Sequence, residues 1–152
     1  MAQPADHDAA PLHLLKMAVG IADLDDLRRV RARRIEQLGG SWVYTRNHPR
    51  RGEAVLAGGS LYWVIRGQIR VRQRITGFSS ERDEKGRTYC LIGVAPELVA
   101  TVWRPWRPFQ GWRYLTPADA PPDAPRGWVM PETDDGAMPA HMVAELRSLG
   151  LL

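Results

Sequence analysis

The sequence predicts an α+β domain: a mostly antiparallel sheet, curled or closed into a small β-barrel, with two or three helices. Three observations predict this class. Short β-prone runs recur with turn residues between them, so consecutive strands are expected to be joined by hairpins and not by helical crossovers. One segment, residues 23–38, has a strong helical pattern. The 14 glycines and 12 prolines favour short elements and many turns.

The first expected elements are a strand and the main helix. Residues 12–19 alternate loosely and predict a strand. Residues 23–38 predict a helix, with Asp23 as its N-cap and Gly39 at its C-terminal stop. Its apolar side chains fall within one arc of the helical wheel, and Arg31 falls inside that arc. Arg31 must therefore extend its charged end to water or find a partner.

The middle of the chain predicts alternating strands and turns. Pro49 is expected to begin a short helix that ends before Gly58. Arg66 and Gly67 are expected to form a hairpin turn, because Gly67 can adopt a positive φ. Further strands are expected at residues 42–45, 61–65, 68–78, 88–94 and 99–103.

The chain is expected to form one folded core with two less regular ends. A length of 152 residues suits a single domain. Residues 1–11 are expected to be disordered, and residues 12–117 to form the α+β core. Residues 118–152 are expected to form a proline-rich acidic arm and a C-terminal helix over 139–149 that packs on the core.

Several features favour a cytoplasmic protein that does not enter a membrane. The polar, acidic N-terminus lacks the basic-then-apolar order of a signal peptide. The longest apolar runs fall far short of the ~20 residues that span a bilayer. Cys90 is the single cysteine, so no disulfide forms within the chain.

Positive charge is concentrated in the middle of the chain. Residues 28–113 hold 18 basic and 6 acidic residues, whereas the segments on either side are both acidic. Of 21 basic residues, 19 are arginine, a preference typical of a genome rich in GC. Codon usage does not explain the clustering. A central basic block is expected of a phosphate-binding surface.

The strand over residues 68–78 carries a row of arginines. Arg70, Arg72 and Arg74 alternate with apolar or amide side chains, so they are expected to share one face. Side chains on one face repeat every ~6.6–6.8 Å, close to the phosphate spacing of an extended single strand. The row therefore suits a nucleic-acid backbone, although a solvated face or a protected edge strand has the same pattern.

Two further basic segments could contact an anion. One surrounds the expected helix start, where backbone N–H groups bind anions; it contains Arg46, Asn47, His48, Arg50 and Arg51. The other lies within residues 103–114, where tryptophans either stack on bases or close the core. Its candidate residues are Arg104, Trp106, Arg107, Trp112 and Arg113.

Common catalytic and cofactor motifs are absent from the sequence. The four histidines are scattered and the cysteine has no partner at metal-ligand spacing, so no metal site is expected. There is no phosphate loop, dinucleotide fingerprint or nucleophile elbow. No cofactor is expected, and the sequence leaves open whether any reaction is catalysed.

Four motifs resemble an uncharacterised proteobacterial family that is known only as a domain of unknown function. They are TRNHPRR at residues 45–51, GGSLYWVI at 58–65, VRQRI at 71–75 and PFQGWRYL at 108–115. The resemblance implies no activity and no site residue. The order of basic segment, short helix, aromatic strand and basic strand also resembles PUA-like domains at the level of the fold. Such domains are small β-barrels that often bind RNA.

Three functions are consistent with these patterns. The first is binding of RNA, another single strand or a nucleotide-like anion through a basic, aromatic-lined face. The second is an enzyme for a small anionic substrate, with arginine clamps and with His48 as base in a deep pocket beside Glu53 or Glu97. The third is a protein-interaction module centred on the residues of 103–114. The oligomeric state remains open.

Overall fold

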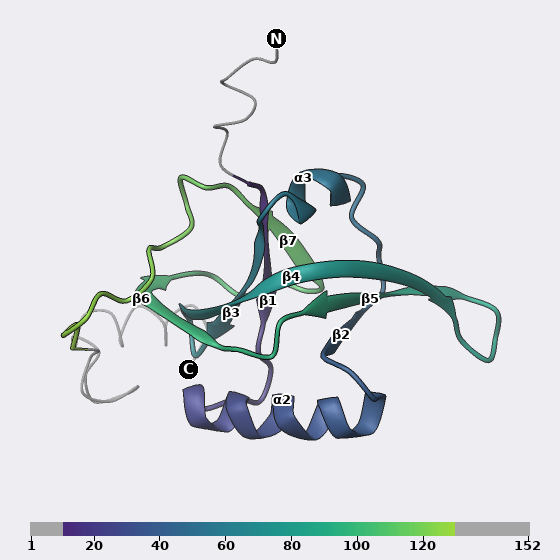
Figure 1. The fold of residues 1–152 in the computed structure, drawn as a ribbon, viewed down its shortest axis with the longest axis horizontal. Coiled ribbons are helices and arrows are strands. Elements are labelled where there is room, and N and C mark those ends of the chain that lie inside the picture. The colour runs from purple at the N-terminus through teal and green to yellow at the C-terminus, as the bar shows by residue number, and fades with distance from the viewer. Residues whose placement is uncertain (1–10, 130–152) are drawn as a thin grey trace, which may run out of the picture.

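The computed structural model describes residues 11–129 and contains a seven-stranded mixed sheet with two helices (Figure 1). The α+β class is therefore confirmed. The helices are α2 (Leu24–Leu38) and α3 (Gly52–Leu56). The strands are β1 (His13–Met17), β2 (Trp42–Thr45), β3 (Ser60–Ile65), β4 (Gln68–Arg82), β5 (Thr88–Val94), β6 (Val99–Pro105) and β7 (Trp112–Leu115).

The sheet is open, so the expectation of a closed barrel is wrong. Its strands follow the order β2-β5-β4-β3-β1-β7, and β6 also pairs with β4. The length of β4 explains this arrangement. Its first half pairs with β3 along one edge and β6 along the other, while its second half pairs with β5. Figure 1 shows the β4–β5 hairpin extending away from the body of the protein, so the strands lengthen the sheet and do not close it.

One pair of strands departs from the expected hairpin topology. β1 and β3 are parallel, with Leu14 opposite Leu61, whereas all other pairs are antiparallel. A parallel pair needs a long connection. Here α2, β2 and α3 all lie within that connection. The β3–β4 turn does follow the prediction, because Arg66 and Gly67 both have positive φ, 50° and 79°.

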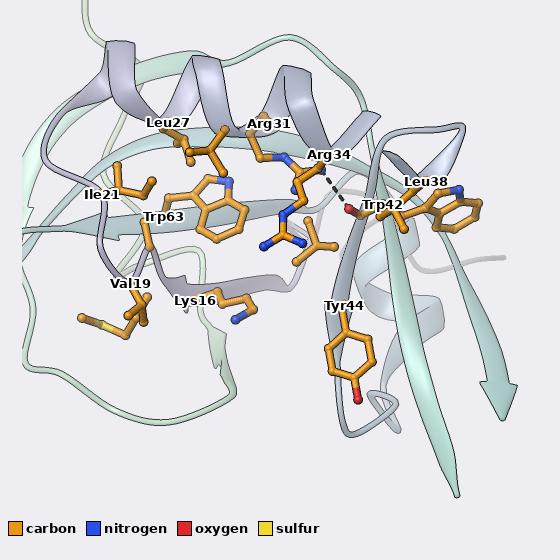
Figure 2. A pocket seen from close by; sticks show the side chains of 14 residues that line it. Lys16, Val19, Ile21, Leu27, Arg31, Arg34, Leu38, Trp42, Tyr44 and Trp63 are labelled. Atoms are coloured by element: carbon orange, nitrogen blue, oxygen red, sulfur yellow. Dashed lines mark hydrogen bonds between the residues drawn. The ribbon is translucent and has the colours of Figure 1, made fainter. Parts of the chain in front are cut away.

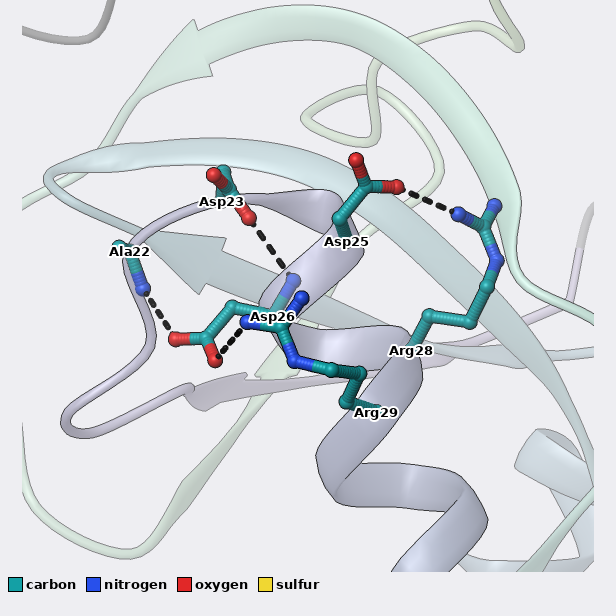
Figure 3. A network of polar contacts seen from close by, with 6 residues as sticks. All are labelled: Ala22, Asp23, Asp25, Asp26, Arg28 and Arg29. Atoms are coloured by element: carbon teal, nitrogen blue, oxygen red, sulfur yellow. Dashed lines mark hydrogen bonds and ion pairs between the residues drawn. The ribbon is translucent and has the colours of Figure 1, made fainter.

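The carboxylates of Asp23 and Asp26 fix the beginning of α2, because each accepts a hydrogen bond from a backbone N–H (Figure 3). The Asp23 carboxylate accepts a bond from the Asp26 N–H at 2.8 Å, and the Asp26 carboxylate accepts one from the Ala22 N–H at 3.0 Å. The bond from Ala22 is the largest cause that lowers the pKa of Asp26. At the other end, Gly39 has a φ of 72° and donates to the Ile35 carbonyl, as the predicted stop requires.

Apolar side chains cover both faces of the sheet. On one face, Leu14 and Trp63 pack with Leu27 of α2 in the larger cluster. On the other face, the neighbouring residues Leu15 and Val64 belong to a smaller cluster. Every residue of β3 is buried. This central strand is therefore the layer that separates the two clusters.

Most expected elements in the described residues exist, with shifted ends. The second helix is shorter than expected, because α3 begins at Gly52 and not at Pro49. β4 continues past residue 78 because it pairs with β5 as far as Arg82. β7 was not expected, and it begins within the basic segment of residues 103–114. The expected C-terminal helix and residues 1–10 lie outside the described residues.

Candidate functional site

A cleft of about 360 Å³ lies between α2, the C-terminal end of β1 and the edge strand β2 (Figure 2). Trp63 of β3 lies in the middle of this view, with Ile21 and Leu27 on one side of it and the arginines on the other. Among the residues that the structure describes, the lining contains no aspartate and no glutamate. Its residues are Lys16, Met17, Ala18, Val19, Ile21, Leu27, Val30, Arg31, Arg34, Leu38, Trp42, Val43, Tyr44 and Trp63.

Three cationic side chains line the cleft. Lys16 comes from β1, and Arg31 and Arg34 come from successive turns of α2. Arg31 is only 7% exposed. One of its terminal nitrogens, Nη2, donates to the Trp42 carbonyl at 2.9 Å, whereas its Nε has no acceptor among residues 11–129. Within the same range none of the three cations forms an ion pair.

None of the three acidic residues of α2 lines the cleft, and two of them form ion pairs elsewhere. Asp25 pairs with Arg28 at 2.8 Å, and Asp26 pairs with Arg29 at 2.9 Å (Figure 3). Both pairs are spaced three residues apart on the first two turns of the helix. The third acidic residue, Glu36, is exposed and does not line the cleft either.

Burial makes two of these positive charges, those of Lys16 and Arg31, costly. It lowers the pKa of Lys16 below its usual 10.5. Burial is also the main cause that lowers the pKa of Arg31, and the neighbouring charge of Arg34 adds to the effect. A bound anion would oppose both causes, because it offers the cations an opposite charge and an acceptor.

The rest of the cleft is aromatic and apolar. Trp63 is 5% exposed, and its Nε1 donates to the Gln73 side chain at 2.9 Å, which fixes the indole ring. Five large apolar side chains are exposed among residues 11–129, and three of them line this cleft: Val19, Leu38 and Tyr44. Such a concentration of exposed apolar surface around one cleft is typical of a ligand site.

The predicted arginine row is interrupted by a β-bulge. At Arg70 the register of β4 shifts against both of its neighbouring strands. Against β3, Ile69 pairs with Val64 and Val71 with Trp63. Against β6, Ile69 pairs with Arg104 and Val71 with Ala100. Alternation is therefore lost at Arg70. Arg70 is buried, with its guanidinium 3.8 Å from the centre of the Trp103 ring.

The other two arginines of the row differ from each other. Arg72 forms two hydrogen bonds with the Asp123 carboxylate, at 2.7 and 2.8 Å, and a third with the Ser60 hydroxyl. Arg74 is exposed. The expectation that the three arginines share one face is therefore wrong.

The segment before α3 forms a junction with β7. The Trp112 indole donates to the Asn47 carbonyl at 2.8 Å, and the Tyr114 hydroxyl accepts a bond from the Arg51 N–H at 3.0 Å. Because α3 has five residues and begins after Arg51, the predicted helix start at Pro49 is wrong. Arg46, Arg50 and Arg51 are exposed, and the Arg46 guanidinium lies 6.0 Å from the Tyr44 ring centre.

His48 lacks the surroundings that the enzyme hypothesis requires. It is exposed, its Nδ1 lies 3.3 Å from the Ser80 hydroxyl, and its ring contacts Phe78. No carboxylate of residues 11–129 forms a hydrogen bond or an ion pair with it. The expected partnership with Glu53 or Glu97 is therefore wrong.

The remaining predicted residues lie on β6, on β7 and in the loop between these strands. Trp106 packs half-buried against the smaller apolar cluster, and Arg104 approaches Asp119 at 3.5 Å. Arg113 lies over the Phe109 ring at 5.1 Å, and Arg107 is exposed. None of the predicted site residues lines the cleft.

Sequence reasoning did not select the cleft residues as a site, but it contained one indication of them. Arg31 was expected inside the apolar arc of the main helix, and that is where the structure places it. Lys16 and Trp63 lie in apolar strands whose patterns predict only core positions.

Within residues 11–129 no three His, Cys, Asp or Glu side chains lie close enough together to hold a metal ion. Neither described helix combines the length and apolar composition needed to cross a membrane.

Comparison with known proteins places the chain in a family. The model of a family described as a protein of unknown function (DUF1489) matches residues 14–152, so the chain belongs to this family. No curated protein and no solved structure matches the chain significantly. The resemblance to PUA-like domains thus finds no support. The family assigns no activity, and the functional argument depends on the geometry of the cleft.

Proposed function

We propose that this DUF1489 protein binds a nucleotide-like anion in the cleft between α2 and the sheet. The observation that carries the proposal is the charge of the cleft: Lys16, Arg31 and Arg34 converge where residues 11–129 place no carboxylate. One of them, Arg31, is nine-tenths buried and keeps an N–H without an acceptor among the described residues. Buried cations that lack partners are costly, and an anionic ligand removes that cost.

The size and lining of the cleft favour a nucleotide over a bare inorganic anion. A volume of about 360 Å³ lies at the lower end of the ~300–1,000 Å³ range of small-molecule sites. Phosphate alone would leave most of the apolar lining unused. A nucleoside monophosphate would place its phosphate at the cations and its flat base against apolar and aromatic walls that include Trp63 and Tyr44.

Arginine is well suited to the proposed role. Its guanidinium presents a planar set of N–H donors that matches phosphate geometry, and it keeps its charge when buried. Arg31 already uses Nη2 to hold the Trp42 carbonyl, which fixes the side chain before any ligand arrives. A donor that is fixed in advance loses less conformational freedom on binding.

Calorimetric titration with each of the four ribonucleoside monophosphates tests the proposal. Arg34→Met is the informative variant because Arg34 is exposed and lines the cleft, so the fold should tolerate the change. Arg33→Met is its matched control, since Arg33 is an exposed residue of the same helix and does not line the cleft. Loss of one charge-assisted contact should weaken binding by about tenfold or more.

The unphosphorylated nucleosides provide the second comparison. They should bind much more weakly than the monophosphates, because they do not engage the three cations. Equal binding of nucleosides and monophosphates would contradict the proposal. So would equal losses in Arg34→Met and Arg33→Met, or no binding of any monophosphate at low salt.

A further inference from the structure

Two tyrosines form an aromatic surface that adjoins the cleft. Tyr44 of β2 is 51% exposed and lines the cleft, and its ring centre lies 5.0 Å from that of Tyr89 on β5. The two rings are tilted by 34°. Figure 2 shows Tyr44 on β2 below Arg34 and Trp42, with its ring at the margin of the site. The aromatic surface therefore begins at the ligand cleft and continues onto the β2–β5 pair.

The register of β2 and β5 explains why these rings face solvent. Tyr44 lies opposite Leu91, and Tyr89 is two residues from Leu91, so all three point to the same face. Their neighbours Val43, Thr45, Cys90 and Ile92 are buried on the opposite face. Because the buried face fixes the register, the tyrosine pair is held on the solvent side.

Arg46 adds positive charge beside this pair. Its guanidinium lies 6.0 Å from the Tyr44 ring centre, and its side chain is 48% exposed. Its hydrogen bond to the Thr88 carbonyl, at 3.1 Å, connects the end of β2 to the β4–β5 hairpin. Its approach to Asp83 is long, 3.9 Å, so this partner neutralises the charge only weakly.

We infer that the cleft receives the phosphorylated end of a single-stranded nucleic acid, and that the next base stacks on Tyr44 and Tyr89. This inference rests on the proposed function and names the source of its nucleotide. The terminal phosphate contacts Lys16, Arg31 and Arg34. The first internal phosphate lies near Arg46, and the strand continues along the solvent face of β2 and β5.

Charge favours a strand end over an internal segment. A terminal phosphomonoester carries close to two negative charges near neutral pH, whereas an internal phosphodiester carries one. Three converging cations, with no carboxylate from the described part of the chain beside them, match the doubly charged group better. Exposed aromatic rings beside a basic site are also the arrangement with which proteins hold single strands, since every base has a face that can stack.

Fluorescence anisotropy with a labelled oligouridylate tests the inference. A length of about ten nucleotides lies inside the ~4–16 nucleotide range of comparable sites. Three strands are compared: one with a 5′-phosphate, one with a 3′-phosphate and one with neither, the label being placed on an internal base. One of the two phosphorylated strands should bind at least about tenfold more tightly than the unphosphorylated strand.

The variant that isolates the aromatic surface is Tyr89→Ala, because Tyr89 does not line the cleft. It should weaken binding of the phosphorylated strand by about fivefold or more and leave uridine monophosphate binding unchanged. Tyr89→Phe keeps the ring and should retain the affinity of the wild type. Thermal melting of both variants verifies that the hairpin remains folded.

The outcomes separate the inference from the proposed function. If uridine monophosphate binds but neither phosphorylated strand binds more tightly than the unphosphorylated strand, the cleft takes a free nucleotide and the inference is wrong. The same conclusion follows if Tyr89→Ala and Tyr89→Phe bind the strand equally well. If no monophosphate binds, the proposed function itself fails, and the inference fails with it.

Discussion

Replacing Arg31 with methionine separates the two roles that a buried arginine can have. Removing an arginine that stabilises the fold lowers the free energy of unfolding. Removing an arginine whose role is to bind a ligand does not. Arg31 is 7% exposed, with one hydrogen bond to the Trp42 carbonyl at 2.9 Å and an Nε that has no acceptor among the described residues. Methionine keeps most of the apolar stem and removes the charge.

The expected change in stability is small because two effects oppose each other. Losing the hydrogen bond to the Trp42 carbonyl costs about 0.5–1.5 kcal/mol, since water from the open cleft can replace the donor only in part. Removing the unpaired Nε relieves a desolvation cost of about 1–3 kcal/mol. The midpoints of the two ranges differ by about 1 kcal/mol in favour of the variant. The free energy of unfolding should therefore stay the same or rise by about 1 kcal/mol, or about 2–4 °C in Tm for a chain of this size. Monophosphate binding should be lost.

Urea denaturation measures this change, and Arg72→Met is the comparison. Arg72 has two short bonds to Asp123 and one to Ser60, and the Asp123 carboxylate is half exposed. Its removal should cost about 2 kcal/mol, with an unchanged denaturant slope and intact ligand binding. If Arg31→Met loses as much stability as Arg72→Met and still binds nucleotide, Arg31 is a structural residue and the reasoning is refuted.

Three further predictions follow from pKa shifts and close packing. Burial, and then the charge of Arg72, lower the pKa of His13 below its usual 6.5, so the unfolded chain binds more protons in this range. Stability should thus fall as the pH drops below 6.5, and His13→Gln should flatten this dependence in urea titrations. Because burial lowers the pKa of Lys16, nucleotide affinity should decline at alkaline pH before 10.5 is reached, and Lys16→Arg should remove that decline in calorimetry. In Gly59→Ala, the new Cβ would overlap the carbonyl oxygens of residues 12 and 55, with one contact at 2.6 Å, so thermal melting should show a loss of more than about 2 kcal/mol.

Local patterns predicted much of the fold because most elements are determined by nearby residues. The N-cap Asp23, the stop at Gly39 and the Arg66–Gly67 turn depend on side-chain and backbone preferences that the sequence displays directly. The parallel pairing of β1 with β3 was missed because it joins residues about 47 positions apart, and no local preference specifies it. The open sheet was missed for the same reason.

The candidate site was predicted less well than the fold. Clustering of arginines in sequence suggested a surface, but the bulge at Arg70 and the partner Asp123 changed the environments of two members of the row. Both effects depend on tertiary contacts. Arg31 was the exception, since a charge inside an apolar helix face is unusual in any context. The identity of its neighbours across the cleft, Lys16 and Trp42, required the structure.

Resonances of the arginine Nε–H groups test the central claim most directly. Titrating isotopically labelled protein with uridine monophosphate should move the Nε–H signals of Arg31 and Arg34, because the ligand supplies an acceptor and an opposite charge. The signal of Arg33, outside the cleft, should stay in place. Shifts confined to arginines outside the cleft, such as Arg50 or Arg107, would show that the anion binds elsewhere and would contradict the account.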